Sequence, residues 1–209
     1  MRQVAVEQPA VDATMTHDNQ EPGACTACAL HATRTQVVQP DGPGQGLMAV
    51  GEAPGAQEDA QGVGFAGTAG RTLDRVLAEY GIPREGYART NIVRCRPPDN
   101  RRPRRAEIQA CSGWLDATLT AFAPRVLLAV GHTATRHLLP YWKDNHLGRL
   151  RTLLDTRPDV AELPRYRGTP VVPMPHTSGL SWNQRQRDGR PVSELGRTAV
   201  ELAVGLAAR

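Results

Sequence analysis

Four cysteines form the clearest chemical pattern in this sequence. Cys25 and Cys28 make a CxxC pair, and Cys95 and Cys111 follow as a second, more widely spaced pair. Four thiolates can hold a tetrahedral zinc ion or a [4Fe–4S] cluster, and their spacing alone does not choose between the two. Four unrelated buried cysteines are the third alternative, because free cysteine is often buried. A bound group would tie the N-terminal segment to the chain around Cys111.

A run of arginines accompanies the second cysteine pair. Its members are Arg94, Arg96, Arg101, Arg102, Arg104 and Arg105. Prolines stiffen this stretch, and guanidinium groups match phosphate oxygens, so it is a candidate surface for a polyanion. A solvated charged surface is the alternative. Lys143 is the single lysine among 25 basic residues, so the other 24 are arginine, and codon usage can also produce that bias.

The composition indicates one globular domain. The chain has 209 residues, of which 40% are hydrophobic, and a net charge of +4. No apolar run approaches the roughly 20 residues of a membrane span, and the N-terminus lacks a signal-peptide stretch. We therefore predict a cytoplasmic protein, where cysteines ligate metals more often than they form disulfides. We expect a flexible arm over 1–22, one domain over 23–209, and a monomer.

Apolar runs and helical spacing alternate along the chain. Strands are expected at 47–50, 89–93, 126–131 and 170–174, and helices at 72–80, 106–122, 133–139 and 192–207. This alternation predicts a three-layer α/β/α domain with a central, mostly four-stranded parallel sheet. The stretch 141–168 shows no clear pattern. In such sheets functional loops follow the carboxyl ends of the strands.

Six segments, taken in order, resemble one protein family. They are 51–59, the glycine-rich loop 61–70, 90–98, 100–103, 125–131 and 176–178. Together with the cysteines, they make the chain similar to the iron–sulfur (family four) uracil-DNA glycosylases from about Cys25 to Leu206. The resemblance implies hydrolysis of the N-glycosidic bond of deoxyuridine in DNA after base flipping, which releases uracil and leaves an abasic site. It also implies a [4Fe–4S] cluster on the four cysteines, and single- or double-stranded DNA as partner.

The resemblance assigns the catalytic positions. His176 would support negative charge on O2 of the leaving uracil. Of the carboxylates Glu52 and Glu58, one would orient water and favour an oxocarbenium-like sugar, and the other would exclude the 5-methyl group of thymine. We assign the first role to Glu52 and the second to Glu58. Exposed loop glutamates and a structural histidine are the alternatives. Of the six histidines, only His132 also lies near a predicted site loop.

Ala53, Phe65 and Asn91 complete the predicted base pocket. The Phe65 ring, with small neighbours, could stack on a base, unless it is a core phenylalanine. The Asn91 amide suits N3–H and O4 of uracil and mismatches cytosine, unless it is a capping residue. Gly64 and Ala66 are smaller than the residues the family usually carries, which predicts some tolerance of 5-substituted uracils.

DNA contacts are predicted outside the pocket. Arg101, Arg102, Arg104 and Arg105 would contact phosphates, and Leu180 would wedge into the stack where the base left. No lysine lies in a predicted site, so water is the expected nucleophile. Two other functions stay open at this point: a damaged-DNA binding protein of the same fold with weak or lost catalysis, and an unrelated zinc or redox protein.

Overall fold

The structure is a computed structural model that describes residues 22–142, 145–156, 158–186 and 188–209. The arm expected over 1–22 lies outside the described residues except for Pro22, and so does Lys143. No helix in the described part of the chain is long and apolar enough to cross a membrane.

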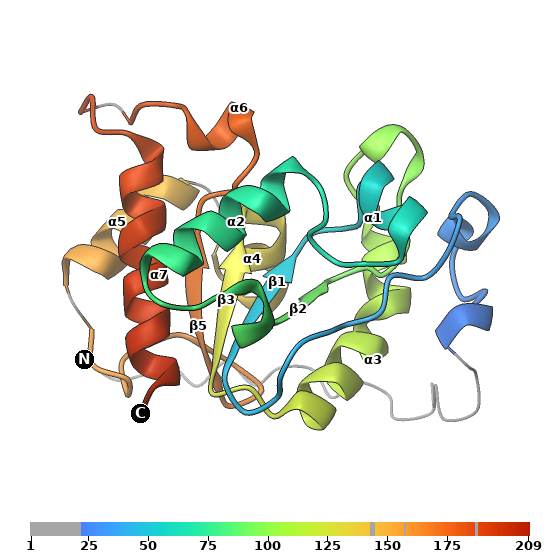
Figure 1. Cartoon of the computed structure of the whole chain (residues 1–209), viewed down its shortest axis with the longest axis horizontal. Coiled ribbons are helices and arrows are strands. Elements are labelled where there is room, and N and C mark those ends of the chain that lie inside the picture. Colours follow the sequence, from blue (N-terminus) through green and yellow to red (C-terminus); the bar gives the residue numbers. More distant parts are fainter. Residues whose placement is uncertain (1–21, 143–144, 157, 187) are drawn as a thin grey trace.

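A five-stranded sheet forms the centre of the molecule, in the order β2-β1-β3-β5-β4 (Figure 1). The strands are β1 (Leu47–Gly51), β2 (Ala88–Asn91), β3 (Val126–Val130), β4 (Arg165–Tyr166) and β5 (Thr169–Met174). The first three pair in parallel with each other or with β5, and only the short β4 is antiparallel. The predicted, mostly four-stranded parallel sheet is therefore confirmed. Its inner strands are buried along their whole length, because helices cover both faces.

Helices lie on the two faces of this sheet. They are α1 (Ala56–Gln61), α2 (Thr68–Glu79), α3 (Arg105–Phe122), α4 (His132–Leu138), α5 (His146–Asp155), α6 (Gly179–Trp182) and α7 (Val192–Ala207). α2 and α7 contact each other on one face, and α3 and α4 lie on the other (Figure 1). Short 3-10 turns occur at Pro22–Ala24, Ala29–Ala32, Arg84–Gly86 and Pro98–Asn100. The three-layer prediction is confirmed.

Two differences from the sequence prediction have local causes. α2 begins at Thr68 rather than near Thr72, because Gly67 takes the extended conformation of an N-cap residue. α5 occupies part of the stretch 141–168, for which no element was predicted. Its buried residues Leu150 and Leu154 have helical spacing, but polar residues interrupt the pattern, and its packing on α7 supplies the missing stabilisation.

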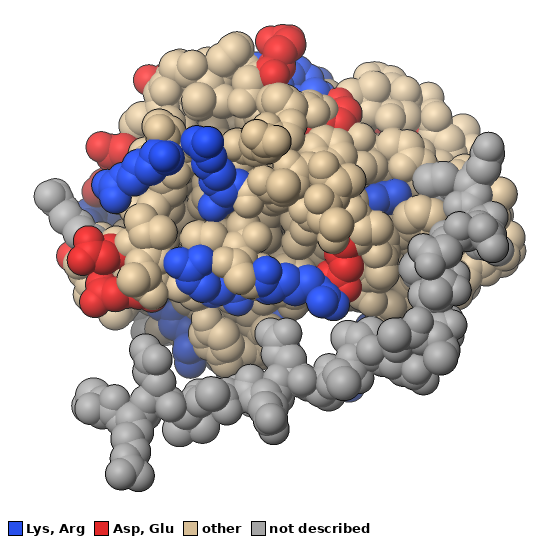
Figure 2. Space-filling model, turned by 90° about the horizontal axis from the view of Figure 1, so that it is seen from below, with Lys and Arg blue, Asp and Glu red and all other residues tan. Residues whose placement is uncertain are grey.

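Basic side chains are spread over the molecule. Figure 2 looks from below Figure 1, the side away from α6, and arginine side chains lie on that side as well. Arginine content by itself therefore does not mark the functional surface.

Candidate functional site

The loops after β1 and β5 meet over the carboxyl edge of the sheet and enclose a cleft. Its volume is about 360 Å³. Residues from five segments line it, and they include Glu52, Arg102, His132, His146, His176 and Leu180. Four of these, Glu52, Arg102, His176 and Leu180, are residues that the sequence predicts for the site. The topology brings them together because the carboxyl ends of parallel strands share one edge.

Two side chains of the predicted base pocket, Asn91 and Phe65, both approach Gly51 at the end of β1. In the sheet Gly51 pairs with Asn91, the last residue of β2. A Cβ atom on Gly51 would lie 2.3 Å from Oδ1 of Asn91 and 2.8 Å from Cζ of Phe65. Only glycine therefore lets the amide and the aromatic ring approach the strand end together. Neither side chain is part of the cleft lining, which in this part of the chain begins one residue later, at Glu52.

The Asn91 side chain is buried and has no partner in the described structure. The residue is 7% exposed. Its backbone belongs to the β1–β2 ladder, but among the described residues its amide makes no hydrogen bond. Since no described side chain or backbone group engages it, this amide is available to a ligand.

Phe65 is held in position by a charged pair behind its loop. Its φ angle of 54° places it in the left-handed region, which is uncommon for a bulky residue. Arg84 donates to the carbonyls of Gly64 at 2.8 Å and Phe65 at 3.2 Å. Arg84 also forms an ion pair with Asp74 at 2.9 Å, and Asp74 accepts a hydrogen bond from the Tyr87 hydroxyl at 2.5 Å. These contacts hold the backbone of the loop at Phe65, whose side chain is buried in the main hydrophobic cluster.

Glu58 joins two loops of the predicted pocket. Its Oε2 accepts the N–H of Gly55 at 3.0 Å, and its Oε1 accepts the N–H of Gly67 at 2.7 Å. The carboxylate therefore connects the loop after β1 with the start of α2, a positioning role that the sequence did not reveal. Exclusion of a 5-methyl group by Glu58 stays a prediction. Ala53, on the same loop, packs against an apolar cluster around Cys95.

The imidazole of His176 has a defined tautomer. Its Nδ1 accepts the backbone N–H of Ser178 at 3.0 Å, so the neutral ring carries its hydrogen on Nε2. The ring packs on Gly131, where a Cβ atom would lie 2.9 Å from its Cδ2. Burial lowers the pKa of His176, and nearby Glu52 opposes that shift. The result is a neutral hydrogen-bond donor at the cleft.

Sequence reasoning missed His146 and set His132 aside. His146 accepts a hydrogen bond from Nε1 of Trp142 at 3.0 Å on Nδ1, and its Nε2 lies 3.3 Å from the carbonyl of Met174. Burial lowers the pKa of His146 to about 4. The ring centroids of His132 and His146 are 5.2 Å apart. The leucines of α5 at helical spacing were the signal that could have found His146.

The predicted basic surface divides into exposed and engaged arginines. Arg101 forms two hydrogen bonds to the buried carboxylate of Glu107, at 2.9 and 2.6 Å, and holds the pKa of that carboxyl below its usual value. Arg102, Arg104 and Arg105 are exposed, and Arg102 reaches the cleft.

Arg94 faces the protein interior instead of solvent. It is 6% exposed and donates to the Trp114 carbonyl at 3.0 Å and to the Thr118 hydroxyl. Its guanidinium also lies 5.1 Å from the centre of the Trp114 ring. Arg94 is therefore not part of a DNA-contacting surface.

Leu180 projects from α6 at the edge of the cleft. It is 87% exposed, which is unusual for a large apolar side chain. Trp182, two residues later, is buried, and it lies so close to Gly196 of α7 that a Cβ there would be 2.3 Å from the indole. The buried tryptophan thus anchors the helix that presents the exposed leucine.

The four cysteines form no disulfide bonds with one another. Cys95 belongs to a small apolar cluster with Leu30 and Val93, and Cys28 and Cys111 pack against that cluster. Burial raises the pKa of Cys95, and it raises the pKa of Cys111 to about 11. Within the described ranges, no group of three or more His, Cys, Asp or Glu residues is arranged to hold a single metal ion.

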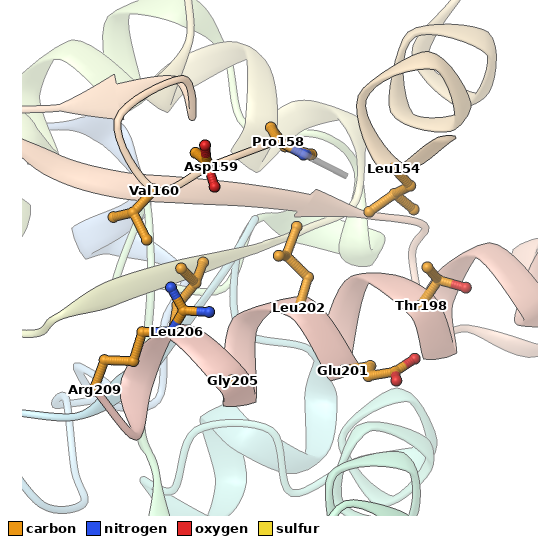
Figure 3. Close-up of a pocket in the computed structure, with 10 residues that line it drawn as sticks. All are labelled: Leu154, Pro158, Asp159, Val160, Thr198, Glu201, Leu202, Gly205, Leu206 and Arg209. Carbon is orange, nitrogen blue, oxygen red and sulfur yellow. The ribbon is translucent and has the colours of Figure 1, made fainter. Parts of the chain in front are cut away.

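A larger hollow of about 530 Å³ lies elsewhere, between α5, α7 and the chain at 158–160 (Figure 3). Leu154, Val160 and Leu202 give it an apolar floor, with Glu201 and Arg209 at its rim. None of the site residues predicted from the sequence lines it. Volume alone therefore does not identify the functional site. The titratable residues predicted for the site line the smaller cleft instead.

The chain is similar in sequence to a known protein family. The family profile described as "Uracil DNA glycosylase superfamily" matches residues 40–198. The chain is 45% identical over 111 residues to a type-4 uracil-DNA glycosylase of Thermotoga maritima, an alignment covering 53% of this chain and 58% of the relative. It is 40% identical over 116 residues to the type-4 uracil-DNA glycosylase of Pyrobaculum aerophilum, covering 55% and 59%.

A third relative is similar over a comparable part of its length. The type-4 uracil-DNA glycosylase of Sulfurisphaera tokodaii is 38% identical over 124 residues, which cover 58% of this chain and 56% of the relative. The matched region therefore spans less than two thirds of the length of each of these three relatives.

Proposed function

Because this chain belongs to the uracil DNA glycosylase superfamily, we propose that it hydrolyses the N-glycosidic bond of deoxyuridine in DNA. The products are free uracil and an abasic site. The observation that carries this proposal is the unpartnered Asn91 amide, held beside the Phe65 ring at Gly51, the residue that precedes Glu52 of the His176 cleft. A stacking surface, an amide and a hydrogen-bond donor are the groups that recognition of a flipped pyrimidine requires.

Base recognition rests on Asn91 and Phe65. The Asn91 amide offers one acceptor and one donor group, which suit N3–H and O4 of uracil. Cytosine presents the reversed pattern at those positions and would leave buried polar groups unpaired, at about 1–3 kcal/mol each. Phe65 would supply a ring for stacking, on a loop whose backbone is held by the contacts of Arg84.

Bond cleavage sends negative charge into the departing base. The Nε2–H of neutral His176 is a donor for uracil O2, where that charge collects. Glu52 lines the same cleft, where its carboxylate is suited to orient water and to stabilise positive charge on the sugar. With water as the nucleophile, the enzyme is a monofunctional hydrolase.

DNA would approach over α6 and the basic loop 101–105. The exposed Leu180 is placed to fill the gap left by the flipped base. The exposed Arg102, Arg104 and Arg105 are placed to contact phosphates beside it.

The four cysteines are proposed to hold a [4Fe–4S] cluster. Cys28, Cys95 and Cys111 surround one apolar cluster, and Cys95 interacts electrostatically with both Cys25 and Cys28. A bound cluster would supply a rigid cross-link between the N-terminal segment and α3. Four cysteines that form no disulfide among the described residues suit the reducing cytoplasm, where we propose the protein works as a monomer.

Uracil release from a synthetic oligonucleotide tests the proposed reaction. Wild type should release uracil, while Asn91→Ala and His176→Ala should be strongly impaired. Thr198→Ala, in the hollow between α5 and α7, is the matched control and should behave as wild type. A wild-type protein that binds the uracil-containing strand without releasing the base would contradict hydrolysis and favour a damaged-DNA binding protein.

A further inference from the structure

Arg34 connects the two halves of the cysteine set. Its Nη1 donates to Sγ of Cys95 at 3.5 Å and to the carbonyl of Cys25 at 2.7 Å. Its Nη2 donates to the carbonyl of Gly23 at 3.1 Å. One guanidinium group therefore contacts the N-terminal CxxC segment and a thiol from the second pair.

A second cation lies on the inner side of the same cysteines. The buried guanidinium of Arg94 interacts electrostatically with Cys111, Cys25 and Cys95. Its hydrogen bonds to Trp114 and Thr118 hold it in place. The cysteines thus lie beside two positive charges, one fixed in the interior and one at the half-exposed surface.

A cluster with four thiolate ligands carries net negative charge in its common oxidation states. Placing such charge in an apolar surrounding is costly unless opposite charge or hydrogen bonds compensate it. Hydrogen bonds to ligand sulfurs and nearby charge are also the main protein influences on the reduction potential of these clusters.

We propose that Arg34 is a positioning residue of the cofactor site, which clamps the Cys25–Cys28 segment onto Cys95 and, together with Arg94, compensates the negative charge of a [4Fe–4S] cluster. This inference rests on the proposed cluster. It assigns Arg34 two separable effects, because the guanidinium supplies both a charge and a fork of donors. The charge should raise the reduction potential, and the fork should slow loss of iron.

Two substitutions separate these effects in the full-length protein. Arg34→Gln removes the charge, and Arg34→Lys keeps the charge but not the fork. Arg75→Gln, at an exposed position of α2, is the matched control for loss of one arginine. Proteins purified without oxygen are compared for iron content, for the midpoint potential of one-electron reduction at an electrode, and for the rate of iron loss to a chelator.

Arg34→Gln should have a lower midpoint potential than wild type and lose iron several-fold faster. Arg34→Lys should keep a midpoint potential near that of wild type but still lose iron faster. If Arg34→Gln holds no cluster, the rate of iron loss from Arg34→Lys still tests the inference. Wild-type potential and wild-type iron retention in both variants would overturn the inference while leaving the cluster intact. Wild type that contains no iron would instead overturn the proposed cluster, so the two failures are distinguishable.

Discussion

At the scale of single residues, we expect base selection to depend on the side chain of Asn91. Its place at the end of β2 is set by the strand, and its freedom to bind is set by the absence of a partner among the described residues. Phe65 lies beside it, and we expect its ring to stack on any base, since stacking is tolerant of sequence. The two residues should therefore respond differently to substitution.

Asn91→Asp should reduce uracil excision and weaken discrimination against cytosine. An ionised carboxylate has no donor for O4 of uracil but accepts from the cytosine amino group. The loss of about 1–3 kcal/mol corresponds to roughly 5-fold to 150-fold in rate. Relative uracil and cytosine release at pH 7 measures the effect. Phe65→Ala serves as control, because it should weaken both substrates alike, and an unchanged uracil preference in Asn91→Asp would show that Asn91 does not read the base.

His176 predicts the acid side of the pH–rate profile. Burial lowers its pKa, so the neutral Nε2–H tautomer persists below the ordinary value of 6.5. Protonation would place a hydrogen on Nδ1, which accepts the Ser178 N–H, and activity should fall there. His176→Gln should lose about 100-fold to 1,000-fold in rate and should lack this acid limb. The same acid limb in wild type and His176→Gln would assign it to another group.

At the scale of elements, the start of α3 decides which arginines can reach DNA. The N–H of Arg104 donates to Glu107 at 2.6 Å, and Arg101 closes on the same carboxylate from the loop. This arrangement caps the helix and uses one arginine to fix the loop. The side chains of Arg102, Arg104 and Arg105 are exposed and form no ion pair among the residues described.

Replacing Arg102, Arg104 and Arg105 together by alanine should make DNA binding less dependent on salt. For each phosphate that the variant no longer neutralises, the slope of log affinity against log salt should fall by about 0.9 on duplex DNA and 0.7 on single strands. Titrations over a range of salt concentrations measure this slope. Arg101→Ala is the matched control from the same loop, and it should lower thermal stability and leave the slope unchanged. An unaltered slope in the triple variant would mean that the loop is only a solvated surface.

At the scale of the whole molecule, the site depends on contacts between distant segments. α5 brings His146 to the cleft, where it bonds to Trp142 and to the end of β5. Its low pKa, about 4, follows chiefly from burial, with the nearby His132 adding to the shift. Because the pKa of His146 is lower in the folded than in the unfolded chain, the free energy of unfolding depends on pH.

Stability should therefore fall on acidification between pH 6.5 and about 4. In this window the unfolded chain protonates His146 and the folded chain does not, so the unfolded state binds more protons and stability rises with pH. At about 1.4 kcal/mol per pKa unit, the contribution of His146 is on the order of 3 kcal/mol. His137 and His176 act in the same direction, because burial also lowers their pKa values.

Chemical unfolding at several pH values checks this expectation. His146→Gln keeps groups that can bond to Trp142 and Met174 but does not titrate. Its free energy of unfolding should change less steeply across the window, by about one proton. Equal slopes for wild type and His146→Gln would contradict a buried, neutral His146.

Local patterns determined much of this protein. Continuous apolar runs are typical of strands buried on both faces, and so β1, β3 and β5 were predicted close to their observed bounds. Asn91 was correctly placed at a strand end, and the rule that strand ends share an edge predicted that Glu52 and His176 would meet. These inferences succeed because they depend on neighbours in the sequence and on the handedness of crossovers.

The tertiary structure alone decided how individual polar groups are used. Arg94 and Arg101 were indistinguishable in sequence from exposed Arg102, and only the folded chain brings Trp114 and Glu107 against them. The role of Glu58 likewise depends on two backbone N–H groups from separate loops. A charged side chain is fixed by whichever partner the fold places within hydrogen-bond reach, and long-range packing, which local sequence does not encode, determines that partner.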